Sequence, residues 1–211
     1  SQIVLINNKF KSNQIPVTSG VPQGGHLSPW LFNFVNDICN GVKSSKFLLF
    51  ADHLKLFKAV SSVNDCSSLQ ADLNSIVLWC SSNCMSLNID KCKYISFTRK
   101  KLPHHYVYSI NNSMLEKVHT IRDLGVLFDS EITFVNHINA IVNKAYQMLG
   151  FIKRQLSEFH DTNCLRIVYL SYVRSVLDYC SFVWSPHYSF HSNRIEGVQN
   201  KFLRACAFKM N

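Results

Sequence analysis

The sequence predicts an α+β fold, and two observations lead to this prediction. Up to about residue 130, short apolar runs bounded by turn-forming residues alternate with two amphipathic helical patterns. Beyond residue 130, apolar residues recur only at helical spacing, in three successive stretches. We therefore expect a mixed first domain at residues 1–130 and a helical second domain at residues 131–211.

The mixed domain begins with two short strands, at residues 3–6 and 15–18. A helix is expected next, at residues 29–42. Ser28 can cap this helix, and Pro29 suits a first helical turn because that position needs no N–H donor.

Two apolar runs follow, at residues 46–50 and 54–60, and they predict a hairpin with Asp52 and His53 at its tip. A second amphipathic helix is expected at residues 63–86. The rest of this domain is expected to contain a loop leading into a strand, a hairpin turning at Asn111-Asn112-Ser113, and a last strand. These segments are residues 87–97, 106–110, 114–118 and 121–128.

Three amphipathic helices account for the second domain, and they can pack together as a small bundle. Thr133 and Thr162 are expected to begin the first two. The helices are expected at about residues 133–152, 162–176 and 191–209.

The chain is basic, with 22 Lys and Arg against 13 Asp and Glu, for a net charge of +9. The excess is spread over both halves of the chain. A distributed positive charge suits a partner that is contacted along its length, such as a phosphate backbone. The alternative is an ordinary solvated basic surface.

The eight cysteines form no Cys-x-x-Cys pair, and no signal peptide is recognisable. We therefore expect reduced cysteines and an intracellular protein, nuclear or cytoplasmic and not secreted. A zinc site made of Cys80, Cys84 and His104 or His105 is disfavoured, because the spacing fits no closed site. No apolar run approaches the ~18 residues that a membrane span requires.

Five stretches of the chain resemble, in the right order, the motifs of one known family. The matching segments are Ser19-Gly-Val-Pro-Gln-Gly-Gly-His-Leu-Ser-Pro-Trp-Leu-Phe32 (motif B), Phe50-Ala-Asp-His53 (motif C), Leu87-Asn88 with Lys91, Lys93 and Phe97 (motif D), Leu124-Gly-Val-Leu-Phe-Asp129 (motif E), and the helical remainder. They resemble reverse transcriptases of non-LTR, LINE-like (jockey-type) retrotransposons. The resemblance covers nearly the whole chain.

This resemblance implies a fold and an activity. The fold would be a partial polymerase palm, with an antiparallel sheet and packed helices, followed by a thumb-like helical bundle. Fingers and motif A are expected to precede residue 1. The activity would be RNA-directed DNA polymerisation, in which two Mg²⁺ (or Mn²⁺) ions assist transfer of a dNTP to a DNA primer on an RNA template. No membrane partner is implied.

The resemblance also assigns roles to single residues. Asp52 would be a catalytic metal ligand, and His53 stands where the family has a second Asp. Ala51 would lie beside the primer end, although a small residue also suits a tight turn. Lys91 would be a general acid and Lys93 a substrate contact, the alternative for each being a solvated loop charge.

Substrate contacts are implied for Pro22, Gln23 and Gly24, because glycine permits close approach of the backbone. The alternative is a turn that simply caps the following helix. In the helical domain, a template–primer duplex could be followed by Lys144, Lys153, Arg154, Arg166, Arg174, Lys201 and Arg204. Tyr179, Trp184 and Tyr188 could stack on bases. The alternative is that they belong to the core, which is the commoner role for Trp and Tyr in such a run.

Negative charge is scarce around the expected metal site. Mg²⁺ prefers hard oxygen ligands, whereas His53 offers nitrogen and no negative charge. Residues 1–36 contain no Asp or Glu. We therefore expect weak metal binding and an inactive isolated chain, unless a complementing polymerase chain supplies carboxylates. The rival interpretations are a non-catalytic nucleic-acid-binding remnant and a decayed fragment.

Overall fold

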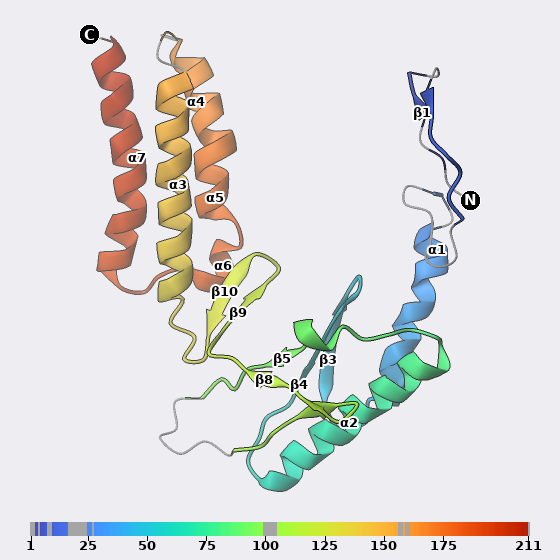
Figure 1. Ribbon diagram of the computed structural model, residues 1–211. Helices are drawn as coiled ribbons and strands as arrows, with labels where there is room; N and C mark the ends of the chain where they lie inside the picture. Colours follow the sequence, from blue (N-terminus) through green and yellow to red (C-terminus); the bar gives the residue numbers. More distant parts are fainter. Residues whose placement is uncertain are drawn as a thin grey trace. The chain divides into compact units, whose positions relative to one another are not determined.

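The computed structural model describes residues 3, 5–7, 10–16, 25–26, 28–98, 105–155, 158 and 161–210 (Figure 1). It mixes helices and strands, which confirms the expected class. The chain forms two compact units. Unit 1 comprises residues 1–91 and 104–115, and unit 2 comprises residues 92–103 and 116–211. Residues 116–129 therefore group with the helices. The observed boundary thus lies earlier in the chain than the boundary near residue 130 that we expected from the sequence.

Unit 1 begins with a short antiparallel ribbon of β1 (Leu5–Ile6) and β2 (Phe10–Lys11). The second strand thus lies earlier than the expected residues 15–18. Residues 17 and 18 lie outside the described part. The expected helix forms as α1 (Ser28–Phe32) followed by the 3-10 helix η1 (Asn33–Gly41). Side chains three residues apart are eclipsed in a 3-10 helix, and this spacing turns Val35 and Ile38 together into the core.

The expected hairpin is confirmed as β3 (Lys46–Phe50) and β4 (His53–Phe57). Helix α2 (Val63–Ser82) follows and begins at a capping box, in which Ser62 and Asp65 bond reciprocally. It ends four residues earlier than expected, where Cys84 takes a left-handed φ of 54°. A small core joins these elements, made of Ile38, Cys39, Ile76 and Cys80 with Leu49, Leu54 and Leu56 packed against it.

Unit 1 ends with the 3-10 turn η2 (Ile89–Lys91) and the hairpin of β6 (Ser109–Ile110) and β7 (Ser113–Met114). Asn111 and Asn112 form its two-residue turn with φ of 48° and 63°. Two successive left-handed residues make the turn that matches strand twist, and asparagine tolerates this conformation. The expected hairpin is therefore present, with shorter strands.

Unit 2 contains a parallel pair, β5 (Lys93–Tyr94) with β8 (Glu116–Lys117), and a hairpin of β9 (Thr120–Asp123) and β10 (Val126–Asp129). The single strand expected at 121–128 was wrong, because the chain reverses at Leu124 and Gly125, whose φ values are 43° and 91°. Over the described residues, five separate two-stranded pairings replace the expected single sheet, and one of them is parallel.

The helices of unit 2 are α3 (Val135–Gln155), α4 (Thr162–Tyr169), the π-helical turn η3 (Leu170–Arg174), α5 (Ser175–Asp178), α6 (Ser181–Trp184) and α7 (Ser189–Met210). Asp161 caps α4, in place of Thr162. One apolar cluster joins them, centred on Ala145, Leu149, Val173 and Val198. Within the described ranges, every helix is too short or too polar to cross a lipid bilayer.

The π-helical turn has a clear cause in the spacing of the buried residues. Leu165, Tyr169, Val173 and Leu177 are all buried, and each lies four residues after the last. In a regular α-helix of 3.6 residues per turn, such a row drifts by about 40° at every step. A wider π turn in the middle removes much of this drift, so that the whole row faces the core.

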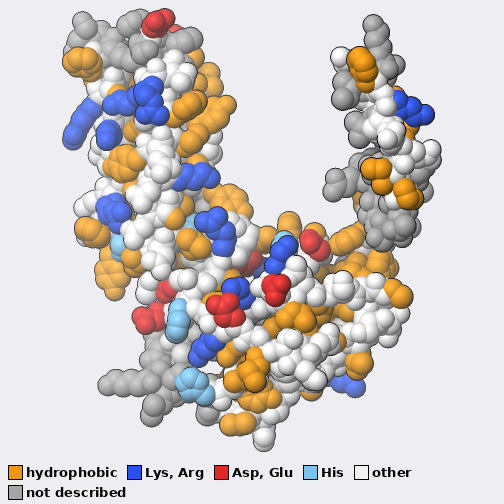
Figure 2. All heavy atoms as spheres, viewed as in Figure 1, with side chains coloured by type: hydrophobic (Ala, Val, Ile, Leu, Met, Phe, Trp, Pro, Cys, Tyr) orange, Lys and Arg blue, Asp and Glu red, His pale blue; other side chains and the backbone are white. Residues whose placement is uncertain are grey.

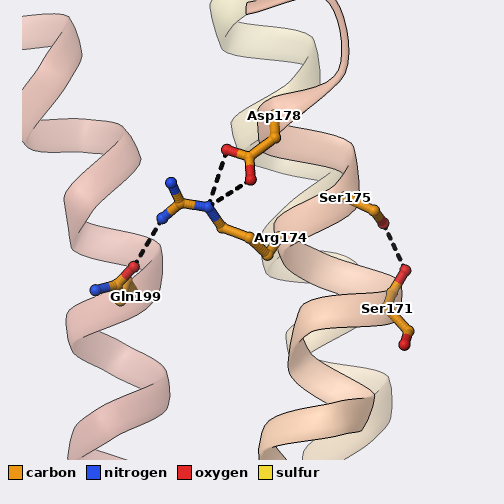
Figure 3. A network of polar contacts seen from close by, with 5 residues as sticks. All are labelled: Ser171, Arg174, Ser175, Asp178 and Gln199. Atoms are coloured by element: carbon orange, nitrogen blue, oxygen red, sulfur yellow. Dashed lines mark hydrogen bonds and ion pairs between the residues drawn. The ribbon is translucent and has the colours of Figure 1, made fainter.

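A polar network then ties this helical segment to α7. The Arg174 guanidinium donates through Nε to both oxygens of Asp178, at 2.9 and 2.8 Å, and through Nη1 to Gln199, at 2.9 Å (Figure 3). Arg174, one of the residues expected to follow a duplex, is therefore engaged within the bundle.

Candidate functional site

The candidate site is the tip of the β3–β4 hairpin. Phe50 pairs with His53, so Ala51 and Asp52 form a two-residue turn. Ala51 has a φ of 52°, a conformation that costs a residue with a Cβ about 1 kcal/mol or more. Ala51, Asp52 and His53 are all exposed, so the carboxylate and the imidazole project into solvent. The sequence placed these two groups correctly at a hairpin tip.

The two faces of this hairpin differ. Leu49, Leu54 and Leu56 pack against the core of unit 1. Side chains alternate along a strand, so the opposite face carries Leu48 and Phe50, which are 58% and 61% exposed. The hairpin that carries the tip is therefore packed on only one of its two faces.

Asp72 of α2 fixes the base of the hairpin, and sequence reasoning missed it. It is only 4% exposed. Its carboxylate accepts hydrogen bonds from the backbone N–H groups of Lys43, Ser44 and Ser45, at 2.9, 3.0 and 2.7 Å, and from the Ser44 hydroxyl at 2.6 Å. The signal was a charge on the buried stripe of an amphipathic helix, four residues before Ile76.

These bonds also determine the ionisation of Asp72. Burial alone would raise the pKa of this carboxyl, but the hydrogen bonds from Ser44, Lys43 and Ser45 lower its pKa far below the usual range. Asp72 is therefore ionised at neutral pH although it is buried in unit 1, and it holds the segment that leads into β3.

The other residues expected at the site are spread over the chain. Lys91 ends η2 in unit 1 and is exposed, and its N–H donates to the Asn88 carbonyl at 3.2 Å. Lys93 belongs to unit 2, where its ammonium forms an ion pair with Glu116. Pro22, Gln23 and Gly24 lie outside the described residues.

The residues at the tip do not suit a pair of Mg²⁺ ions. In the part of the chain that the structure describes, no three His, Cys, Asp or Glu side chains gather as a metal site would need. Asp52 offers one carboxylate and His53 an imidazole nitrogen, whereas Mg²⁺ prefers several oxygen ligands. His104, one of the disfavoured zinc ligands, lies outside the described residues. All eight cysteines are free thiols, and none forms a disulfide.

The β9–β10 hairpin of unit 2 is held at its tip. The Tyr179 hydroxyl donates to the Leu124 carbonyl at 2.7 Å, and a Cβ on Gly125 would lie 3.1 Å from the Tyr179 ring. Trp184 is 2% exposed and donates through Nε1 to the Tyr179 carbonyl at 2.8 Å. Trp184 therefore has the core role, whereas Tyr179 and Tyr188 remain 52% and 76% exposed.

The base of the β9–β10 hairpin meets α3. The N–H of Leu127 donates to Nδ1 of His137 at 3.3 Å, and His137 is 3% exposed. Burial lowers the pKa of this imidazole, and nearby Arg122 lowers it further. At the end of β10, Asp129 accepts the N–H groups of Thr133 and Phe134, at 3.0 and 2.7 Å, just before α3 begins at Val135. The Thr133 hydroxyl accepts the Val135 N–H at 3.4 Å, which is the capping bond expected for Thr133.

Comparison with known proteins settles the family. Residues 1–157 match the family described as reverse transcriptase (RNA-dependent DNA polymerase). The chain belongs to this family. No solved structure matches it significantly. The resemblance read from motifs B to E is thereby confirmed.

Curated relatives of this reverse transcriptase chain come from Drosophila transposons. It is 26% identical to the probable RNA-directed DNA polymerase from transposon BS of Drosophila melanogaster, over 96% of this chain and 24% of the relative. It is 28% identical to the RNA-directed DNA polymerase from mobile element jockey of Drosophila funebris, over 89% of this chain and 22% of the relative. The jockey polymerase of Drosophila melanogaster is also 28% identical, over 92% and 22%. The chain thus spans about a quarter of the length of these relatives.

Proposed function

We propose that this chain is part of an RNA-directed DNA polymerase of a jockey-type retrotransposon, acting on an RNA template, a DNA primer and dNTPs. Membership of the reverse transcriptase family supports this proposal. So does the exposed Asp52 at a hairpin tip, a position from which a carboxylate can reach a metal ion shared with other groups. In this proposal unit 1 contributes to a palm and the helices of unit 2 to a thumb.

We further propose that the 211-residue chain alone does not polymerise DNA. The observation that supports this is the composition of the tip, where one carboxylate is accompanied by His53 and by no cluster of acidic groups among the described residues. Carboxylates supplied by another stretch of polypeptide, or by a complementing polymerase chain, would complete the site.

Primer extension on poly(rA)·oligo(dT) tests the proposal. With Mg²⁺ or Mn²⁺, we expect no dTMP incorporation by the isolated chain. We expect the same result for His53→Asp, because a second carboxylate still leaves the site short of ligands. Clear incorporation by the isolated wild-type chain would contradict the proposed inactivity. Incorporation by His53→Asp alone would show that His53 is the only defect.

A second candidate function is non-catalytic binding of nucleic acid, and it is favoured by the exposed cations of unit 2. Lys144, Lys153, Arg166 and Lys201 are all exposed on the helices. Binding to an RNA–DNA hybrid that weakens steeply with salt, without turnover and without any effect of His53→Asp, would support it. Absence of binding at low salt would exclude it.

A further inference from the structure

Strand β3 has one edge that no other strand covers in the part of the chain that the structure describes, where β3 pairs with β4 alone. In an antiparallel pair, every second residue of a strand turns its N–H and C=O groups away from the partner strand. Phe50 and His53 face each other across the two-residue turn, so the outward residues of β3 are Phe47 and Leu49. We call this row of backbone groups the β3 edge.

The side chains beside the β3 edge are mostly apolar. Hydrophobic side chains reach the surface of unit 1 in several places (Figure 2), and Phe47, Leu48 and Phe50 are among those that are exposed. Lys46 is the only charged residue of the strand. Unpaired backbone groups flanked by exposed apolar side chains form a template on which another strand can pair.

We propose that two copies of this chain associate through their β3 edges, which joins the two hairpins into one four-stranded antiparallel sheet. A two-fold axis at Leu48 places Phe47 opposite Leu49 of the second copy, so that the outward N–H and C=O groups of these residues bond one another. Leu48 then faces its own symmetry mate in a non-hydrogen-bonded pair, where side chains lie closest. The contact is isologous, because both copies use the same strand.

The positions of the charges favour β3 over β4 as the shared edge. In the β3 pairing, Lys46 lies at the end of the strand, opposite Phe50 of the second copy, where its apolar stem can cover the ring. If β4 paired with itself through its outward residues Leu54 and Leu56, Lys55 would lie opposite Lys55 of the second copy. Like charges directly opposite each other destabilise a strand pair, and a lysine on an edge strand commonly blocks such contacts.

The isologous pairing also ends at a dimer. A pairing of β3 with β4 of the next copy would be heterologous and would leave one β3 edge and one β4 edge uncovered, so that further copies could add and form a filament. The pairing of β3 with β3 covers both β3 edges at once. Strands of five residues give a small contact area, so we expect the dimer to be weak and reversible.

This dimer does not complete the candidate site at Asp52. Antiparallel pairing directs the two hairpin tips to opposite ends of the sheet. Asp52 follows Leu48 by four residues in each copy, so the two Asp52 residues would be roughly 27 Å apart at about 3.4 Å per residue. The inference is therefore independent of the proposed polymerase function, and the result of primer extension does not bear on it.

Sedimentation velocity of the whole chain, at about 1 to 100 µM, tests this proposal. We expect a monomer–dimer equilibrium for the wild-type chain. Leu48→Lys puts like charges on the two-fold axis and should raise the dissociation constant by about tenfold or more. Phe47→Pro removes an outward N–H group and no bond to β4, so it should also weaken the dimer. The matched control is Leu78→Lys, which adds the same charge at an exposed leucine of α2 and should leave the equilibrium unchanged.

Disulfide formation tests the register of the two strands. In a non-hydrogen-bonded pair the two Cα atoms lie about 4.5 Å apart, within the range that a disulfide spans. On mild oxidation, we expect Leu48→Cys to give a dimer that is cross-linked between the two copies of position 48. Phe47→Cys is the matched control, because position 47 faces position 49 of the second copy, and it should give no such bond. Mass spectrometry distinguishes these bonds from those of the eight native cysteines.

Several results would overturn the proposal. A wild-type chain that stays monomeric at about 100 µM lacks the interface. A dimer that withstands Leu48→Lys and Phe47→Pro, or that Leu78→Lys weakens equally, uses another surface. Assemblies that grow beyond a dimer would indicate the heterologous pairing. Thermal melts check that the variants are folded, and if either β3 variant is not, the cross-linking decides: equal bonding at positions 47 and 48 would contradict the register.

Discussion

The two hairpins that contain the segments resembling motifs C and E are held in different ways. In unit 1, β3–β4 is held at its base, where Asp72 accepts N–H groups from residues 43–45. Its tip at Asp52 is exposed, and no such attachment holds it among the residues that the structure describes. In unit 2, β9–β10 is held at its base, where Leu127 donates to His137, and also at its tip, where the Tyr179 ring lies against Gly125 and its hydroxyl donates to the Leu124 carbonyl.

The difference shows which tip is free to meet a ligand. A carboxylate at an unattached turn can be approached by metal or substrate, and the buried anion behind it keeps the strands in place. A turn covered by an aromatic ring is a structural joint, because its polar group already has a partner. Asp52 is therefore available for chemistry, whereas the turn at Gly125 contributes rigidity.

Removing the anchor of the first hairpin is the largest expected effect. We expect Asp72→Ala to lower the free energy of unfolding of unit 1 by about 3 kcal/mol, because buried N–H groups of Lys43, Ser44 and Ser45 lose their acceptor. Hydrogen exchange followed by mass spectrometry would locate the loss in peptides of unit 1. Ser44→Ala removes one hydroxyl donor only and should cost about 1 kcal/mol. Equal effects of the two variants would contradict the anchoring role.

Crowding the tip of the second hairpin is expected to have the next largest effect on stability. Gly125→Ala places a Cβ against Tyr179 at a φ of 91°, and we expect a loss of about 2 kcal/mol in urea unfolding of unit 2. Adding Tyr179→Ala removes the ring but keeps the strained φ. If the two substitutions act independently, with no coupling in the double variant, the ring does not cover this turn.

The two hairpins should also respond to different ranges of pH. Folded unit 2 holds His137 neutral because the pKa is lowered from the ordinary 6.5, so its contribution is complete above pH 6.5 and is lost as pH falls below that value. The slope can reach about 1.4 kcal/mol per pH unit. Unit 1 should keep the contribution of Asp72 until the pH falls below the ordinary 3.8 of that carboxyl.

Thermal melts from pH 8 to pH 4 check this difference. His137→Gln should flatten the decline of unit 2 between pH 6.5 and pH 5 while leaving unit 1 unchanged. A wild-type unit 2 whose stability is constant over this range would show that His137 takes up a proton without cost.

Changing the free tip should have the smallest effect on stability. Asp52→Asn and His53→Asp alter exposed side chains, and we expect changes within about 0.5 kcal/mol. Asp129→Asn weakens bonds to the N–H groups of Thr133 and Phe134, and it should cost about 1 kcal/mol. A strong destabilisation by Asp52→Asn would mean that this carboxylate has a structural partner.

Sequence reasoning succeeded where the structure is set locally. The β3–β4 hairpin follows from two apolar runs around a polar pair, and the turn at Asn111-Asn112 from two residues that tolerate positive φ. The position of Asp52 at a tip came from the same local pattern. Each of these features depends on residues fewer than twelve apart.

The features that were missed depend on distant pairs. Asp72 meets residues 43–45 across 27 to 29 positions, and Tyr179 meets Leu124 across 55. The turn at Leu124 and Gly125 lies inside an apolar run, which made it resemble a strand. Its glycine was the available signal, because an isolated glycine in such a run marks a bend.

The π-helical turn at Leu170–Arg174 has a consequence for variation in chain length. It stores one surplus residue in the middle of a long helical segment, so a single deletion there could be absorbed by rewinding to an ordinary α-helix. The segment after it would then keep its orientation relative to Leu165, because an α-helix shortened by one residue turns through nearly the same angle as the longer segment with its π turn. A shortened chain would keep a continuous helix, and Leu177 would still face the core in line with Leu165.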